Sequence, residues 1–293
     1  MANILNSSVD FLKRLYYRLL VNPLIERMGI TRCVPRTEMD FQFEIALAEH
    51  CNLNCAGCDH FSPLAKPEFA NYEEVERDFS RLSSLFHGRA KKVQLLGGEP
   101  LLHPELIKFL KMARGNFPDA EIVIVTNGVL LLDQPEEFWL ACGENNIVIS
   151  VSNYPIQLNH KEIEKRAADH GVVYHYCSTG KSSIMKHFNL DVKGLQDSRK
   201  NFLLCYRANQ CIYLQRGRLY TCTFAPTARH FSEYFNTTLT EVPEDSIDIY
   251  QANSAQEILS FLARPIPFCR YCMPGKENQH PWRQSKRAIE EWT

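Results

Sequence analysis

The chain has 293 residues, a formal net charge of −1, 45% hydrophobic and 23% charged residues, as in ordinary globular proteins. A charge this close to zero argues against a nucleic-acid partner. There is no apolar run of membrane-spanning length and no secretory-signal pattern, so we expect a cytoplasmic protein without a membrane span. Eleven cysteines in that setting indicate metal binding or redox chemistry rather than disulfides.

Residues 1–40 are predicted to form a helical N-terminal extension. Apolar positions recur at helical spacing from Val9 to Met28, and Pro23 kinks or divides the helix. This helix either packs on the main domain or lies on a membrane surface.

Residues 41–200 alternate between predicted strands and helices. Short apolar segments predict strands at 41–48, 92–96, 121–128, 147–152 and 172–176. Amphipathic segments between them predict helices at 72–86, 104–117, 136–144 and 161–170. This order is typical of an α/β protein with parallel strands covered by helices, and it indicates a complete or partial (β/α) barrel.

The pattern breaks after Cys177, and residues 201–276 are predicted to form a small second unit. It contains a predicted hairpin at 211–222 that turns at Gly217, and a short helix at 255–262. Its apolar core is small, so we expect this unit to need a bound metal for stability. Residues 277–293 are predicted to form a helical tail.

The loop after the first predicted strand contains three closely spaced cysteines. Cys51, Cys55 and Cys58 follow the pattern C-x3-C-x2-C at the carboxyl end of the strand, where the active sites of parallel barrels lie. A structural zinc site normally takes four protein ligands, and bacterial ferredoxins use a different spacing. Three thiolates can hold three irons of a [4Fe–4S] cubane and leave the fourth iron open to a small molecule.

Two further motifs accompany this loop: GGEP at Gly97–Pro100 and TNG at Thr126–Gly128. Together the three motifs resemble the radical S-adenosylmethionine (radical SAM) superfamily over roughly residues 41–176. The resemblance implies a partial (β/α)6 TIM-like barrel, a [4Fe–4S] cluster on the three cysteines, and S-adenosylmethionine as cofactor. The cofactor-binding residues that it implies are Gly97, Gly98, Glu99, Pro100, Thr126, Asn127, Ser150, Ser152, Asn153 and His60.

The same resemblance implies the chemistry. The open iron chelates S-adenosylmethionine, and one electron from the reduced cluster cleaves it to methionine and a 5′-deoxyadenosyl radical, which abstracts a hydrogen atom from the substrate. A one-electron reductant such as flavodoxin or ferredoxin is implied as partner. One position departs from the family: the residue before the third cysteine is often aromatic and lies near the adenine, whereas here it is Gly57. His60 and Phe61 are the candidate substitutes, and a structural zinc loop is the alternative to a cluster.

The second cysteine set resembles the C-terminal twitch or SPASM-like unit of some radical SAM enzymes, which binds an auxiliary [4Fe–4S] cluster. The set comprises Cys205, Cys211, Cys222, Cys269 and Cys272. Four ligands are available without Cys211: Cys205, Cys222, Cys269 and Cys272. Cys211 is the alternative to Cys205 as a ligand. A zinc ribbon would use the same paired thiols.

Of the remaining cysteines, Cys33 and Cys142 are predicted to lie in the core. Cys177 ends the fifth predicted strand, and its thiol either packs or returns a hydrogen atom to a substrate radical, as in radical epimerases. Three functions compete: dehydrogenation or epimerisation of a small molecule such as a sugar or aminocyclitol, modification of a ribosomal peptide, and a non-catalytic zinc-stapled binding protein.

Overall fold

The computed structural model describes residues 30–177, 184–239 and 241–293. The predicted helix from Val9 to Met28 therefore lies outside the described residues. The described chain begins with two short 3-10 turns, η2 (Ile30–Cys33) and η3 (Glu38–Asp40). Among the described residues, we find no helix with the length and apolar character needed to cross a bilayer.

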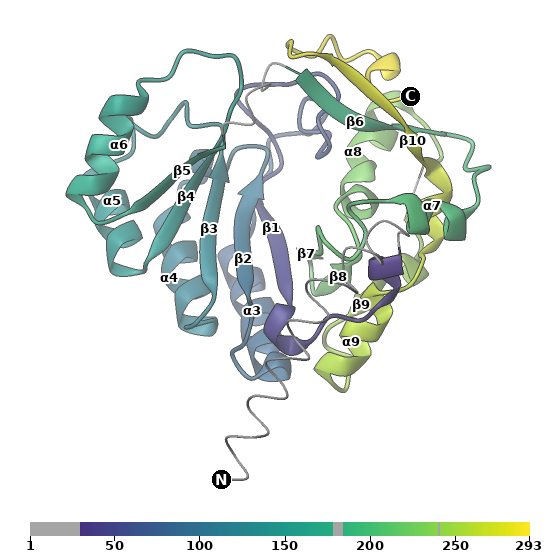
Figure 1. The fold of residues 1–293 in the computed structure, drawn as a ribbon, viewed down its shortest axis with the longest axis horizontal. Coiled ribbons are helices and arrows are strands. Elements are labelled where there is room, and N and C mark those ends of the chain that lie inside the picture. Colours follow the sequence, from purple (N-terminus) through teal and green to yellow (C-terminus); the bar gives the residue numbers. More distant parts are fainter. Residues whose placement is uncertain (1–29, 178–183, 240) are drawn as a thin grey trace.

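The centre of the fold is a parallel sheet, and its order is β5-β4-β3-β2-β1. Each predicted strand is present within two residues of its expected ends. The bounds are β1 (Gln42–Ala48), β2 (Lys92–Gly97), β3 (Glu121–Thr126), β4 (Ile147–Ser152) and β5 (Val173–Cys177). The α/β class and the parallel pairing are thus confirmed, and the curved arrangement of strands in Figure 1 is consistent with a partial barrel.

Four helices follow the strands in turn and cover the outer face of the sheet (Figure 1). Their bounds are α3 (Tyr72–Phe86), α4 (Leu106–Asn116), α5 (Glu136–Glu144) and α6 (His160–Asp169). Alternate residues of β1, such as Phe43, Ile45 and Leu47, are buried in one core with these helices. Ala46 between them packs against a second core instead, so the two faces of β1 serve different parts of the molecule.

The C-terminal half extends the sheet rather than standing apart from it. β7 (Tyr213–Gln215) pairs with β1 at Glu44, and β8 (Arg218–Tyr220) and β9 (Ser246–Asp248) follow as antiparallel strands. The predicted hairpin is confirmed, and its turn residues Arg216 and Gly217 have φ values of 48° and 72°. Gly217 is needed there, because a Cβ would lie 2.8 Å from the Tyr250 ring.

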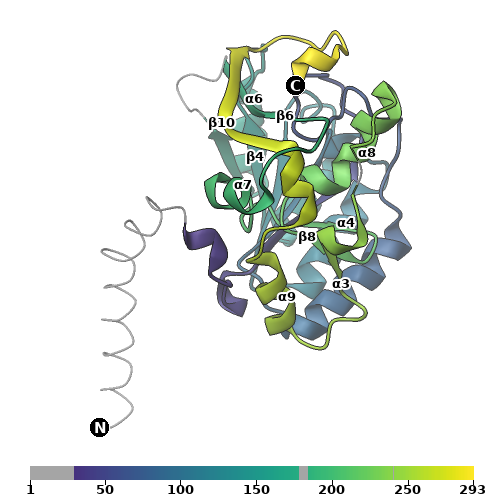
Figure 2. The same ribbon diagram turned by 90° about the vertical axis from the view of Figure 1, so that its right-hand side faces the viewer.

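The remaining elements of this half divide between the two cores. The second core receives buried residues from α7 (Ser198–Leu204), α8 (Phe224–Phe235) and η6 (Pro267–Tyr271), whereas α9 (Ala255–Leu262) contributes to the first core. The turn η5 (Pro243–Asp245) lies between α8 and α9 in the chain. A separate ribbon pairs β6 (Ile184–Leu190) with β10 (Cys272–Pro281). The carboxyl ends of β1 to β3 point toward this ribbon, and the C-terminus lies at the same end of the molecule in both views (Figures 1 and 2).

Two expectations were wrong in detail, one for the C-terminal tail and one for Cys33. Residues 277–281 continue strand β10, and the rest of the predicted helical tail contains only the turn η7 (Ile289–Glu291). The backbone of Arg283 and Ser285 bonds to the cysteine loop, as described below. Cys33, expected in the core, is exposed because it lies on the edge turn η2, whereas Cys142 is buried as predicted.

Candidate active site

Cys51, Cys55 and Cys58 lie in the loop after β1 and line one cavity of about 210 Å³. The pKa of the Cys55 thiol is raised to about 11 and that of the Cys58 thiol to about 12. Burial is the main cause in both, and the negative charge of a neighbouring cysteine of the three adds to it. Three thiols this close resist losing their protons together, so a bound cation is needed to hold them as thiolates. The donor set fits a cluster with one open iron.

The two glycines of GGEP let the cysteine loop pass directly over the end of β2. The backbone N–H of Gly98 donates to the Ala48 carbonyl (2.7 Å), and the N–H of Glu99 donates to the His50 carbonyl (3.1 Å). A Cβ on Gly97 would stand 2.3 Å from the Ala48 oxygen, and one on Gly98 would stand 2.1 Å from the His50 oxygen. The motif therefore fixes the start of the cysteine loop as well as lining the cavity.

Glu99 is fully buried and its carboxylate is occupied by the protein. One oxygen accepts from the Leu101 N–H (3.1 Å) and the Thr126 hydroxyl (2.6 Å), and the other accepts from the Asn127 N–H (2.9 Å). Burial nevertheless raises the pKa of Glu99 to about 7. The neighbouring Pro100 starts the turn η4 (Pro100–Leu102) and is buried. Glu99 thus ties GGEP to TNG.

Asn127 connects TNG to the first cysteine. Its side-chain amide donates to the Asn52 carbonyl oxygen (2.7 Å) and lies 3.7 Å from Cys51 Sγ. Thr126 and Asn127 line the same cavity as the three thiols. The structure thus brings the three sequence motifs together at one end of the sheet.

The predicted residues of β4 and β5 lie on the neighbouring wall. Ser152 lines the cavity, and Ser150 is on the same sheet face, one alternation deeper. Asn153 accepts a hydrogen bond from the Tyr176 hydroxyl. Cys177 is paired with Ser152 in the β4–β5 register, which places this residue at the cavity end of the sheet.

His60 and Phe61, the candidate substitutes for an aromatic residue at Gly57, differ in position. His60 lines the cavity, and its Nδ1 atom is buried with no hydrogen-bond partner. Phe61 is buried in the second core, where its ring packs edge-on against Phe224. At Gly57 itself a Cβ would lie 2.4 Å from the ring of His187 on β6, so the space beside this position is taken by an aromatic ring from elsewhere in the chain.

In the second cysteine set, four cysteines influence one another and Cys211 differs from them. Cys205, Cys222 and Cys269 each raise the pKa of Cys272, and Cys205 and Cys269 raise that of Cys222. Cys211 is influenced most by burial and by the Glu44 carboxylate. Cys222 also raises the pKa of Cys211, but less than burial and Glu44 do. The mutual influence of the four cysteines other than Cys211 favours them as the set of cluster ligands, and that role stays a prediction. Within 30–177, 184–239 and 241–293, no three His, Cys, Asp or Glu side chains are placed to hold a single metal ion.

A partly buried ion pair connects the two cysteine loops. Arg207 pairs with Asp59, next to Cys58, at 2.6 Å, and the Arg207 backbone N–H donates to Cys205 Sγ at 3.3 Å. The guanidinium also stacks over the rings of Phe188 and Phe224. Asp59 and Arg207 thereby fix the position of one loop relative to the other.

Two tryptophans near the C-terminus contact the cysteine loop, and sequence reasoning missed them. The Trp282 indole N–H donates to Cys55 Sγ (3.1 Å), and the Trp292 indole N–H donates to the Cys58 carbonyl (2.9 Å). Nothing in the local sequence around residues 282–292 marks these contacts, because their partners are more than 200 residues away.

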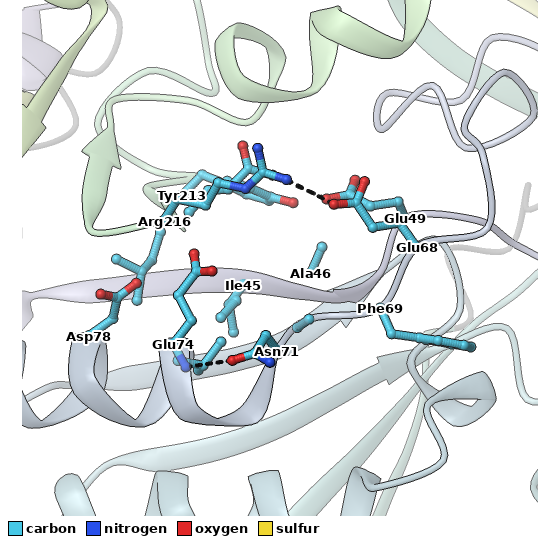
Figure 3. A pocket seen from close by; sticks show the side chains of 14 residues that line it. Ile45, Ala46, Glu49, Glu68, Phe69, Asn71, Glu74, Asp78, Tyr213 and Arg216 are labelled. Atoms are coloured by element: carbon cyan, nitrogen blue, oxygen red, sulfur yellow. Dashed lines mark hydrogen bonds and ion pairs between the residues drawn. The ribbon is translucent and has the colours of Figure 1, made fainter.

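A second cavity, of about 120 Å³, lies on the other side of β1 and contains several carboxylates (Figure 3). Glu49 pairs with Arg229 (3.0 Å) and His230 (2.8 Å), and Glu68 pairs with Arg216 (2.8 Å). Since these carboxylates have cationic partners on the C-terminal half, this cavity is part of the connection between the two halves of the sheet.

A parallel sheet with three thiols at its carboxyl end is the arrangement expected of one class of iron–sulfur enzyme, and a family model matches this part of the chain. Residues 45–152 match the family model of the Radical SAM superfamily. Residues 45–152 are therefore a radical SAM region, and the cofactors that go with it are S-adenosylmethionine and a [4Fe–4S] cluster.

Curated relatives are similar mainly over the barrel. GTP 3′,8-cyclase of Clostridium perfringens (strain SM101 / Type A) is 33% identical over 103 residues, 34% of this chain and 31% of the relative. GTP 3′,8-cyclase of Aquifex aeolicus (strain VF5) is 27% identical over 254 residues, 78% and 76% of the two chains. The chain thus spans about a third of the length of the first of these relatives. A solved structure of BtrN in complex with AdoMet and 2-DOIA aligns over 82% of this chain and 94% of its own, with 16% identity and a TM-score of 0.49.

Proposed function

We propose that this chain is a radical SAM enzyme that removes a hydrogen atom from a small molecule such as a sugar or aminocyclitol, and so dehydrogenates or epimerises it. When bound, the cluster and S-adenosylmethionine supply a 5′-deoxyadenosyl radical. The observation that carries the proposal is the cavity shared by the three thiols, the two glycines of GGEP, Thr126 and Asn127 of TNG, and Ser152.

In this proposal the chain's own residues hold and orient the cofactor. Cys51, Cys55 and Cys58 are the cluster ligands, and the backbone at Gly97 and Gly98 contacts the methionyl amine of S-adenosylmethionine. The polar side chains of Thr126, Asn127, Ser150, Ser152 and Asn153, with His60, contact the rest of the cofactor. Glu99 acts through Thr126 and Asn127, since its carboxylate is fully used by them and by Leu101.

The character of the sheet argues against a substrate with several negative charges. The strands β1 to β5 carry one cation, Lys92, and it pairs with Glu121 at 2.7 Å. A triphosphate is normally held by several cations or backbone N–H groups. GTP, which the curated relatives' names specify, is therefore the second candidate substrate, and a peptide is the third.

Two outcomes for the substrate need different residues. Oxidation of an alcohol carbon removes one hydrogen atom, one proton and one electron, and the auxiliary cluster that Cys205, Cys222, Cys269 and Cys272 would hold supplies a one-electron acceptor. Epimerisation instead needs a hydrogen atom returned to the opposite face of the carbon. Cys177, which is paired with Ser152 at the end of β5, is our candidate donor.

The test is anaerobic reconstitution followed by reduction with dithionite in the presence of S-adenosylmethionine. We expect iron–sulfur absorbance near 400 nm and formation of 5′-deoxyadenosine. Cys55→Ala should lose the 5′-deoxyadenosine and about half of the absorbance, because the second cysteine set can still hold its cluster. The matched control Cys33→Ala, whose thiol is exposed, should keep both. Deuterated candidate substrates then identify the class, because only the true substrate transfers deuterium to 5′-deoxyadenosine. An unchanged rate in Cys55→Ala contradicts the site, and deuterium transfer from GTP or a peptide contradicts the substrate class.

A further inference from the structure

The segment after β10 closes over the cysteine loop through its backbone. Cys55 and Gln284 form an isolated antiparallel bridge. The Ala56 N–H donates to the Arg283 carbonyl (3.0 Å), and the Ser285 N–H donates to the Asn54 carbonyl (2.7 Å). These bonds fix the segment against the loop at the middle cysteine of the three.

This anchoring directs one side chain at a thiol. The Trp282 indole N–H donates to Cys55 Sγ at 3.1 Å, and the ring lies 6.4 Å from that of Tyr154, which lines the cofactor cavity. An indole N–H is a donor only, so this contact can only stabilise negative charge on the sulfur.

We propose that Trp282 is a positioning residue that raises the reduction potential of the cluster held by Cys51, Cys55 and Cys58. This inference rests on the proposed function, because it requires that cluster. The reduced cluster carries one more negative charge than the oxidised cluster, and the ligand sulfurs share that charge. An N–H···S hydrogen bond therefore stabilises the reduced form more, and such bonds are among the factors that set cluster potentials.

The expected size follows from the strength of one hydrogen bond to a charged group. Only the difference between the two oxidation states counts, so removal of the donor should lower the ratio of reduced to oxidised cluster about tenfold at a fixed potential. For a one-electron couple this equals a shift of about 59 mV to more negative potential.

Shielding from water is the rival explanation, and it predicts the opposite sign. Trp282 is partly buried, so its loss would also admit water to the cluster. Water stabilises the more highly charged reduced form and would shift the potential to more positive values. A variant that keeps the ring but lacks the N–H separates the two effects.

The chain offers matched controls, because each of its three tryptophans uses its indole N–H differently. Trp292 donates to the backbone carbonyl of Cys58, and Trp139 on α5 is buried with no partner for its N–H. Trp292→Phe perturbs the same loop without touching a sulfur, and Trp139→Phe removes an indole far from it.

The experiment is a potentiometric titration of the reconstituted full-length chain, followed by EPR of the reduced cluster. The second cysteine set is removed by Cys222→Ser so that one cluster is observed. We expect Trp282→Phe to shift the midpoint potential to a more negative value, so that the ratio of reduced to oxidised cluster at a fixed potential falls about tenfold. Both controls should leave the midpoint potential unchanged. Replacement of Trp282 by benzothienylalanine, which has the same shape and no N–H, should give the same shift if the Phe variant binds iron poorly. Pulsed EPR should also show an exchangeable proton near the cluster that is lost in both variants.

The outcomes distinguish the two levels of the argument. If wild type binds no cluster or does not cleave S-adenosylmethionine, the proposed function is wrong. If wild type does both, an unchanged or more positive midpoint in the benzothienylalanine variant overturns the role of Trp282 alone. An equal shift in Trp292→Phe also overturns it, because displacement of the loop would then be the cause.

Discussion

Gly98 gives the sharpest test of how the cysteine loop is held. In Gly98→Ala the new Cβ would lie 2.1 Å from the His50 carbonyl oxygen and 2.9 Å from the Cys51 nitrogen. Both neighbours are backbone atoms, so neither can rotate away. Going from 2.1 Å to an ordinary contact of 3.4 Å requires the loop or the end of β2 to move by about 1.3 Å.

The cost of this movement has two parts. Overpacking of a fixed backbone costs about 1–3 kcal/mol. The hydrogen bonds from Gly98 to Ala48 and from Glu99 to His50 are disturbed as well, at about 1 kcal/mol each. The free energy of unfolding should therefore fall by roughly 3–5 kcal/mol, which for a chain of this size lowers Tm by roughly 6–10 °C.

The assay combines thermal unfolding with iron content after reconstitution. We expect Gly98→Ala to lose most of the iron bound at the first cysteine set as well as stability. Gly115→Ala on α4 is the matched control, because a Cβ there meets no atom within 4 Å and alanine favours a helix by about 0.5–1 kcal/mol. If Gly98→Ala binds full iron and melts within 1–2 °C of wild type, a change below about 1 kcal/mol, the close passage of the loop over β2 is refuted.

Two further predictions concern Glu44 and Cys211. Burial raises the pKa of Glu44 from 4.5 to about 7, so the folded state binds its proton more tightly than the unfolded state and stability falls as pH rises from about 4.5 to 7. Glu44→Gln should remove up to about 3 kcal/mol of this pH-dependent loss of stability, which would appear as a flatter plot of Tm against pH. An unchanged slope would exclude Glu44 as the source of the pH dependence. Cys211→Ser should keep the iron of the second cysteine set, whereas Cys222→Ser should lose about half of the total iron. If instead Cys211→Ser loses this iron and Cys205→Ser keeps it, Cys211 is the ligand and Cys205 is not.

The sequence was sufficient for the parts of the fold that depend on short-range patterns. Strands β1 to β5 are runs of apolar and β-branched residues, and α3 and α5 have the same bounds in the prediction and in the structure. The three motifs of the site were also visible, because each follows directly on a strand. Their convergence follows from parallel pairing, which brings the carboxyl ends of neighbouring strands together.

The contacts that were missed join residues far apart in the chain. Glu99 reads as a cofactor contact within GGEP, yet its carboxylate is used by Leu101, Thr126 and Asn127. The tail is predicted to be helical because its residues favour helix, but the backbone groups of Arg283 and Ser285 find partners in the cysteine loop, and tertiary contacts override propensity. Gly57 departs from the family pattern for a reason that only the fold shows, since the His187 ring occupies the space beside it.

The closure of the cysteine loop by residues 282–292 also bears on how the protein matures. All three thiols emerge from the ribosome early, but the bonds from Arg283, Ser285 and Trp292 to their loop form only after more than 200 further residues have been made. Long-range contacts of this kind are made late in folding. Iron delivered to a nascent chain would therefore meet a cysteine loop that its C-terminal partners do not yet hold in place. We therefore expect cluster loading to follow synthesis and folding. Expression under conditions that supply iron only after translation should yield as much cluster as continuous supply.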